Sequence, residues 1–365
     1  MKYPIAIQKF RLRARVIWAV LILIIIVASA LAYAFVFYQP PTQAETVPVG
    51  AVLYEWYGFN ETSMKWTGGL GTSHWNDSAD GIVKDEPDIG FYASDNNNTL
   101  AWQLSEMKDA GISWILVSWW GTGNKTQSKT NWELDSAINN ATRNLFKYLA
   151  ANRATFPFKV AIMVENFNGT KESPYDLTSS DYAHIYGYIY TQFYKPFNSS
   201  VFYWEGKPLV TSFNGWMGRL SQNDTFTYEM VGSPPNNFDW NFWQGDGYLT
   251  ASVGTQPWNY EHSPEISKDG EVGLIWRYDD YYLSTFGGDA GGRTGSMRFD
   301  PNGTLGLYDY EWNFVISKAS SVKLVLLYSW NEYHERSEIE PHWDFTIGGN
   351  VSLVGATEYY VSQLH

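Results

Sequence analysis

Short apolar segments alternate with amphipathic segments along residues 47–365. The apolar segments have the length of buried strands, and the amphipathic segments repeat their apolar residues at spacings of three and four, which is typical of helices. The expected strands cover residues 51–56, 113–118, 158–164, 208–213 and 324–329, with a further apolar segment at 272–276. The expected helices cover residues 99–110, 130–148, 182–194, 310–319 and 356–364.

This alternation predicts an α/β fold with a parallel sheet whose two faces are both covered. No G-x-G-x-x-G sequence follows the first strand and no P-loop occurs, which disfavours a nucleotide-binding doubly wound sheet. Residues 47–365 have the length of one large domain, so we expect a (β/α)8 TIM barrel. Residues 215–267 are loop-rich and predict no clear element.

The N-terminal residues have the pattern of a membrane anchor. Residues 16–37 are uncharged and apolar, and a helix of this length spans a hydrocarbon core of about 30 Å. All five basic residues of the first fifteen precede this stretch, which predicts a cytoplasmic tail at 1–15, a transmembrane signal anchor at 16–38 and a barrel outside. A cleaved signal peptide with an A-x-A site is the alternative, but the apolar stretch continues beyond that site. Residues 39–46 are then a proline-containing linker.

Charge and cysteine content exclude several classes of function. The chain has 38 acidic and 25 basic residues and a net charge of -13, so it lacks the basic surface that nucleic-acid binding requires. Because the chain has no cysteine, disulfides, thiolate metal sites and a cysteine nucleophile are excluded. The six histidines are scattered without an HExxH-like pair, and we expect neither a metal nor another cofactor.

Many N-x-S/T sequons indicate a glycosylated, extracellular domain. They begin at Asn60, Asn76, Asn97, Asn124, Asn140, Asn168, Asn198, Asn223, Asn302 and Asn350. Many sequons without any cysteine favour an archaeal cell surface over a eukaryotic secretory pathway. The predicted location is the cell membrane, with a single pass, the N-terminus inside and the barrel outside.

The chain is rich in aromatic residues, which make up 18% of it and include 18 Trp and 26 Tyr. Flat aromatic faces stack on sugar rings, so this composition is typical of a carbohydrate cleft, although a large aromatic core is the alternative. Expected strands also end in polar and aromatic residues, which is where a barrel has its active face. These ends are residues 55–58, 118–121, 165–167, 214–216 and 330–332. We therefore expect an oligosaccharide or polysaccharide substrate.

Four carboxylates follow the last expected strand, at Glu332, Glu335, Glu338 and Glu340. Paired carboxylates beside aromatics at the carboxyl end of a strand are typical of barrels that cleave sugars. A general base must be ionised and a general acid protonated at the same pH, so their surroundings must differ. Repulsion between two neighbouring carboxylates raises one pKa in this direction.

These motifs resemble those of the endo-α-mannosidase family, glycoside hydrolase family 99. The family carries an Asn-Glu-Trp-His-Glu motif, a following Gln-Ile-Glu element, a Tyr-x-Trp-Tyr-Gly element, a His-Trp pair, and Gly-Ile-Asp and Ser-Trp elements. The similar residues of this chain are, in that order, 331–335, 338–340, 54–58, 74–75, 111–113 and 118–119. The resemblance covers most of residues 50–342 and implies a TIM barrel and a retaining, endo-acting mannosidase.

The resemblance also implies a substrate-assisted mechanism that needs no metal. Glu332 matches the base that deprotonates the mannose 2-hydroxyl, which then attacks the anomeric carbon to give an epoxide-like intermediate. Glu335 matches the acid/base that protonates the leaving oxygen and later activates water. The candidate substrate-binding residues are Tyr54, Trp56, His74, Trp119, Glu165, Tyr278, Trp330, Asn331, His334 and Glu340.

The chain departs from the family pattern at four positions. Arg336 stands where the family has Gly, Tyr333 replaces Trp, Glu338 replaces Gln, and Glu55 adds a carboxylate. An Arg336 side chain directed at Glu335 would lower the pKa of that carboxyl and impair an acid. Two alternatives therefore stay open beside the hydrolase: a non-catalytic glycan-binding barrel at the cell surface, or a polysaccharide-assembly enzyme.

Overall fold

The computed structural model describes residues 46–76, 81–122, 132–165, 179–213, 225–232, 240–241, 266–267, 269–286, 298–300 and 302–364. The described residues from Val47 onward belong to one unit. The predicted cytoplasmic tail, the transmembrane segment, the linker up to residue 45 and the strand end at 214–216 lie outside these ranges. Within the ranges, no helix is long and apolar enough to cross a bilayer.

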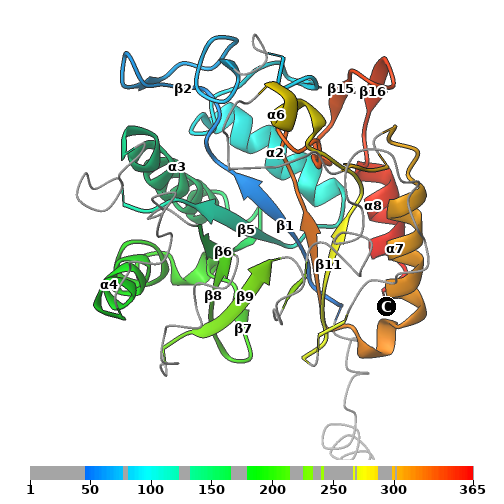
Figure 1. Ribbon diagram of the computed structural model, residues 1–365. Helices are drawn as coiled ribbons and strands as arrows, with labels where there is room; N and C mark the ends of the chain where they lie inside the picture. The colour runs from blue at the N-terminus through cyan, green and yellow to red at the C-terminus, as the bar shows by residue number, and fades with distance from the viewer. Residues whose placement is uncertain are drawn as a thin grey trace, which may run out of the picture. The chain divides into compact units, whose positions relative to one another are not determined.

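A curled sheet of parallel strands forms the centre of this unit (Figure 1). In spatial order its strands are β10 (Trp240–Asn241), β9 (Thr227–Gly232), β8 (Lys207–Phe213), β6 (Lys159–Val164), β5 (Trp114–Trp119), β1 (Val49–Tyr54), β14 (Leu324–Tyr328) and β11 (Glu271–Ile275). Strand β10 also lies against β11. Starting at β1, the strands therefore follow chain order around the curled sheet, which is the order of a (β/α)8 barrel.

Helices connect and cover these strands. They are α2 (Asn97–Asp109), α3 (Trp132–Ala151), α4 (Ser179–Ile189), α6 (Tyr281–Phe286), α7 (Gly306–Ser317) and α8 (Val354–Val361). In Figure 1, α3 and α4 lie to the left of the sheet and α7 and α8 to its right. The predicted helix at 182–194 corresponds to α4 followed by one π-helical turn, Tyr190–Tyr194. The predicted helix at 310–319 begins earlier, at Gly306.

Side chains of the strands alternate between two apolar layers. Val52 of β1 and Leu116 of β5 belong to an inner cluster. Their neighbours Leu53 and Val117 belong to a second cluster, which includes the apolar faces of α2, α3 and α7. Because both faces of each strand are buried, the strands are continuously apolar in sequence.

Short antiparallel strands lie in the connections. They are β2 (Phe59–Asn60), β3 (Lys65–Trp66), β4 (Glu86–Pro87), β7 (Tyr203–Trp204), β12 (Tyr278–Asp279), β13 (Arg298–Phe299), β15 (His342–Asp344) and β16 (Gly349–Val351). Strand β15 pairs with both β4 and β16. This pairing joins the connection after β1 to the segment after β14, next to the residues that carry the candidate carboxylates.

Candidate active site

Glu332 lies in the turn that follows β14 and is 3% exposed. Its backbone N–H donates to the Ser329 hydroxyl at 2.7 Å. The backbone N–H of His334 donates to the Glu332 Oε1 atom at 3.0 Å, and the ring Nδ1 of His334 lies 3.2 Å from the same oxygen. The Glu332 carboxyl is therefore held by His334, two residues further along the same segment.

Glu335 lies one turn further on and is held by two phenols. The Tyr328 hydroxyl donates to Oε2 at 2.6 Å, and the Tyr278 hydroxyl donates to Oε1 at 3.0 Å. The Tyr54 hydroxyl donates to the Tyr328 hydroxyl at 3.0 Å. Strands β1, β12 and β14 thus contribute a chain of hydroxyl groups that ends on the Glu335 carboxyl.

Glu165 follows β6 and brings a third carboxyl to this end of the sheet. The Ser118 hydroxyl donates to Glu165 Oε1 at 2.8 Å, and the Trp120 indole N–H donates to the Ser118 oxygen at 3.0 Å. Burial raises the pKa of Glu165 to about 8, and the charges of Glu332 and Glu335 add to the rise. At neutral pH this carboxyl is therefore protonated and can donate a hydrogen bond.

The charges of the three carboxyls act on the Tyr54 hydroxyl. Burial raises the pKa of Tyr54, and the charges of Glu165, Glu332 and Glu335 raise it further. Burial also raises the pKa of Glu332, against the hydrogen bonds from His334, while the charge of Glu335 adds to the rise. The site therefore concentrates acidic groups with raised pKa values in a buried place, which is a common property of catalytic centres.

Aromatic rings line the same region. The Trp56 ring stacks on the His74 ring with centroids 4.4 Å apart, and it meets the His334 ring edge-on at 5.9 Å. Its centroid lies 4.6 Å from that of Tyr54 and 5.8 Å from that of Trp120. The predicted residues Tyr54, Trp56, His74 and His334 therefore lie together, on the side where the carboxyls lie.

Three predicted substrate-binding residues have their polar atoms engaged inside the fold. Asn331 accepts from the backbone N–H of Tyr54 and donates to its carbonyl, at 2.8 and 2.9 Å. Trp330 donates its indole N–H to Glu340 at 2.9 Å. Glu340 is fully buried. It also accepts from three further donors, which are Tyr92, Gln103 and Tyr333. We therefore assign Asn331, Trp330 and Glu340 to the scaffold of the site.

Trp119 also lies away from the carboxyls. It is fully buried in the helix-facing cluster, where its indole N–H donates to Asn139 of α3 at 3.1 Å and its ring stacks on Tyr188 of α4. Trp119 therefore lies on the helix side of the sheet, whereas Trp120, which donates to Ser118, lies on the side of the carboxyls; the role of either ring in substrate binding stays a prediction. The strand reverses its side chains at each residue, so only one of the two tryptophans can face the carboxyls.

The Arg336 guanidinium lies in a buried ionic network. It donates to Asp85 at 2.8 Å, to Asp279 at 3.0 Å and to Asp344 at 3.2 Å. Arg277 contacts the same Asp85 and Asp344 and also Glu338. Charged groups inside a protein are tolerated when they are paired and hydrogen-bonded in this way.

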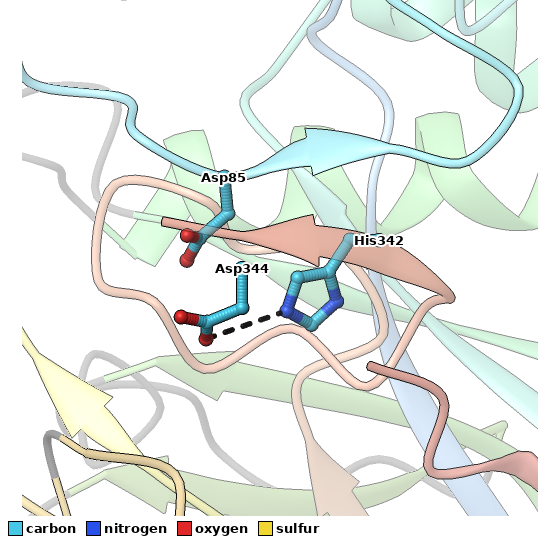
Figure 2. A group of neighbouring side chains, drawn as sticks. All are labelled: Asp85, His342 and Asp344. Carbon is cyan, nitrogen blue, oxygen red and sulfur yellow. Dashed lines mark ion pairs between the residues drawn. The ribbon is translucent and has the colours of Figure 1, made fainter. Parts of the chain in front are cut away.

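Asp85, His342 and Asp344 lie close enough to hold a metal ion (Figure 2). However, Asp85 already accepts from two guanidiniums, Arg277 and Arg336, and from the Phe345 N–H. Asp344 accepts from the same guanidiniums. Burial alone would raise the pKa of Asp344, but His342 and Arg277 lower it below its ordinary value. Because two fixed cations already balance these carboxylates, the group does not fit a resident metal.

Two solved structures of the GH99 endo-α-mannosidase from Bacteroides thetaiotaomicron are similar to this chain, one of them in complex with bis-tris-propane. Each has a TM-score of 0.58 and covers 87% of this chain and 97% of its own, at 18% and 17% identity. A glycoside hydrolase-like protein matches with a TM-score of 0.47 at 15% identity, covering 90% of this chain and 98% of its own. No protein-family model and no curated protein matches the chain. The mannosidase that shares the fold is of the family that the sequence motifs resemble.

Proposed function

We propose that this chain is a retaining endo-glycosidase that cleaves α-mannosidic or related linkages in glycans. The observation that carries the proposal is the pair Glu332 and Glu335, both nearly buried after β14 and both within electrostatic reach of Tyr54. A wall of aromatic rings beside two carboxyls suits a sugar ring and its hydroxyls. The fold shared with an endo-α-mannosidase adds support.

In the proposed first step, Glu332 takes the proton of the substrate 2-hydroxyl. The freed oxygen attacks the anomeric carbon, the glycosidic C–O bond breaks, and Glu335 gives its proton to the leaving oxygen. The Tyr328 and Tyr278 hydroxyls donate to both Glu335 oxygens, which stabilises the carboxylate that remains after proton transfer.

In the proposed second step, Glu335 takes a proton from water as the water attacks the anomeric carbon. The three-membered ring of the intermediate opens, and its oxygen regains the proton from Glu332. Two inversions at the anomeric carbon give net retention. Glu165, protonated at neutral pH, is placed in this proposal as a donor to a sugar hydroxyl.

The test is cleavage of a panel of α-mannan and α-glucan oligosaccharides by residues 45–365, beside Glu332→Gln and Glu335→Gln. We expect cleavage with retained anomeric configuration by the wild type and a loss of at least about 10²-fold in kcat/KM in each variant. Glu358→Gln, at an exposed position of α8, is the matched control and should cleave like the wild type. Binding without cleavage in the wild type would establish the binding-only alternative. Cleavage that both variants retain would remove these carboxyls from the mechanism.

We also propose that residues 16–38 anchor the protein in the cell membrane with the barrel outside. The support is the apolar, uncharged stretch behind a basic tail. Protease added to intact cells should remove the barrel and leave the tail protected. Recovery of the entire chain in the soluble fraction would contradict the anchor.

A further inference from the structure

We propose that Arg336 is a positioning residue that holds the Glu335 carboxyl against Tyr278 for proton transfer. The inference rests on the proposed function, because it assigns Glu335 the role of acid/base. It concerns a position at which the chain departs from the family motif that it resembles.

The backbone around Glu335 is bound directly to the segment that carries Tyr278. The Asp279 N–H donates to the Glu335 carbonyl at 2.7 Å. The Arg277 Nε–H donates to the Arg336 carbonyl at 2.7 Å. Between these two contacts, the Tyr278 hydroxyl reaches Glu335 Oε1 at 3.0 Å. Residues 277–279 thus bind residues 335–336 through three hydrogen bonds, and the contact between the Tyr278 phenol and the Glu335 carboxyl is the middle one.

The Arg336 side chain ties this pair of segments to two others. It bonds Asp279 on the Tyr278 segment, Asp85 ahead of β4, and Asp344 in β15. Its side chain is fully buried, as are those of the three aspartates. Because a guanidinium presents its donors in a fixed plane, these contacts restrict both the direction of the Arg336 side chain and the path of its backbone.

The backbone of Arg336 is in the left-handed region, with φ of 50°. Glycine adopts this conformation without a steric cost, whereas other residues rarely do. Arg336 therefore adopts a backbone conformation that is unfavourable for an arginine, and the contacts of its side chain oppose this cost. The substitution Arg336→Gly relieves the backbone, but it also leaves three buried aspartates with one cation fewer, so the stability of the variant has to be measured beside its activity.

Two substrates distinguish positioning of an acid from general support of the fold. An α-mannan oligosaccharide needs a proton on its leaving oxygen. Fluoride leaves from α-mannobiosyl fluoride without that proton, and added azide attacks the intermediate without a base. With fluoride and azide, the C1–F bond breaks, a C1–N bond forms, and the 2-oxygen regains its proton from Glu332. A variant with a misplaced Glu335 should therefore fail on the first substrate alone.

We expect Arg336→Gly to lower kcat on the oligosaccharide by about 10²-fold with little change in KM. Formation of the glycosyl azide from the fluoride should stay within about fivefold of the wild type. Glu205→Gly is the matched control, because Glu205 has the same φ of 50° in the exposed turn between β7 and β8. This control should behave like the wild type on both substrates.

Urea denaturation of each variant shows whether the fold is intact. If Arg336→Gly does not fold, Arg336→Lys, which keeps the charge but not the planar fork, should show a smaller loss of the same kind. Equal losses on both substrates in a folded variant, or no loss on either, would overturn the inference. A wild type that cleaves neither substrate would instead overturn the proposed function, and the role of Arg336 with it.

Discussion

Glu165→Gln offers a direct test of the electrostatics of the site, independent of any substrate. The wild-type carboxyl has a pKa of about 8 in the folded chain, mainly because of burial, against an ordinary value of 4.5. Below pH 4.5 the carboxyl is neutral in both the folded and the unfolded chain. Above it, the unfolded chain loses the proton while the folded chain keeps it, so the free energy of unfolding falls with rising pH.

The magnitude follows from the two pKa values. Each pH unit between them lowers the free energy of unfolding by about 1.4 kcal/mol, or about 5 kcal/mol in total by pH 8. The side chain is only 7% exposed, so solvent screens little of this effect. The glutamine of the variant does not ionise, and its stability should not carry this contribution.

The assay is urea denaturation followed by tryptophan fluorescence at several pH values from 4.5 to 8. Other buried carboxyls titrate in both proteins, so the quantity of interest is the difference between wild type and variant at each pH. We expect this difference to move by about 5 kcal/mol in favour of Glu165→Gln as pH rises. Glu358→Gln, on the exposed face of α8, should show no such trend. Parallel curves for wild type and Glu165→Gln would mean that Glu165 is already ionised in the folded chain at acid pH, and would refute the reasoning.

Substitutions at four further positions test the division between site and scaffold. Trp119→Ala removes a fully buried ring and should lower the free energy of unfolding by about 3–5 kcal/mol in urea denaturation. Trp120→Ala should lower it less and should raise KM. The reverse ranking of the two variants would contradict the placement of Trp119 in the core and Trp120 at the site. Glu340→Ala leaves four buried donors without their acceptor and should lower the free energy of unfolding by at least about 3 kcal/mol in the same assay. Glu340→Gln should restore part of this loss, and an unchanged free energy in Glu340→Ala would contradict a structural role for these four hydrogen bonds. Asn331→Ala removes the hydrogen-bond partner of the Tyr54 backbone N–H and carbonyl and should lower the free energy of unfolding by about 2–4 kcal/mol. An unchanged thermal unfolding temperature would contradict a structural role for Asn331.

Much of the fold could be predicted from the sequence, because buried parallel strands are apolar on both faces and are therefore visible as runs. Because both faces of these strands are apolar, the sequence does not indicate which face the side chains at the strand ends lie on. At the carboxyl end of β5, the sequence makes Trp119 and the following Trp120 equally compatible with either face, since one face packs on helices and the other on the inner cluster. Only the three-dimensional partners, Asn139 for one tryptophan and Ser118 for the other, decide which lies at the site.

The two structural networks could not be predicted for a different reason. Glu340 takes hydrogen bonds from Tyr92 and Gln103, which lie 248 and 237 residues away in sequence. Arg336 bonds Asp85 across 251 residues. No local pattern records such pairs, so an arginine beside a candidate acid could equally be directed at it or away from it.

The four carboxylates after β14 therefore have two kinds of role. Glu338 accepts from Arg277 within the buried network, and Glu340 is enclosed by four donors, so both are committed to holding the chain in place. Glu332 and Glu335 precede them in the segment after β14 and are bonded to His334 and to phenols, respectively. A catalytic pair must be held to a fraction of an ångström, and this requires fixed neighbours. Because the fixed carboxylates follow the candidate pair within a few residues, loss of either anchor should disturb the pair before it unfolds the barrel.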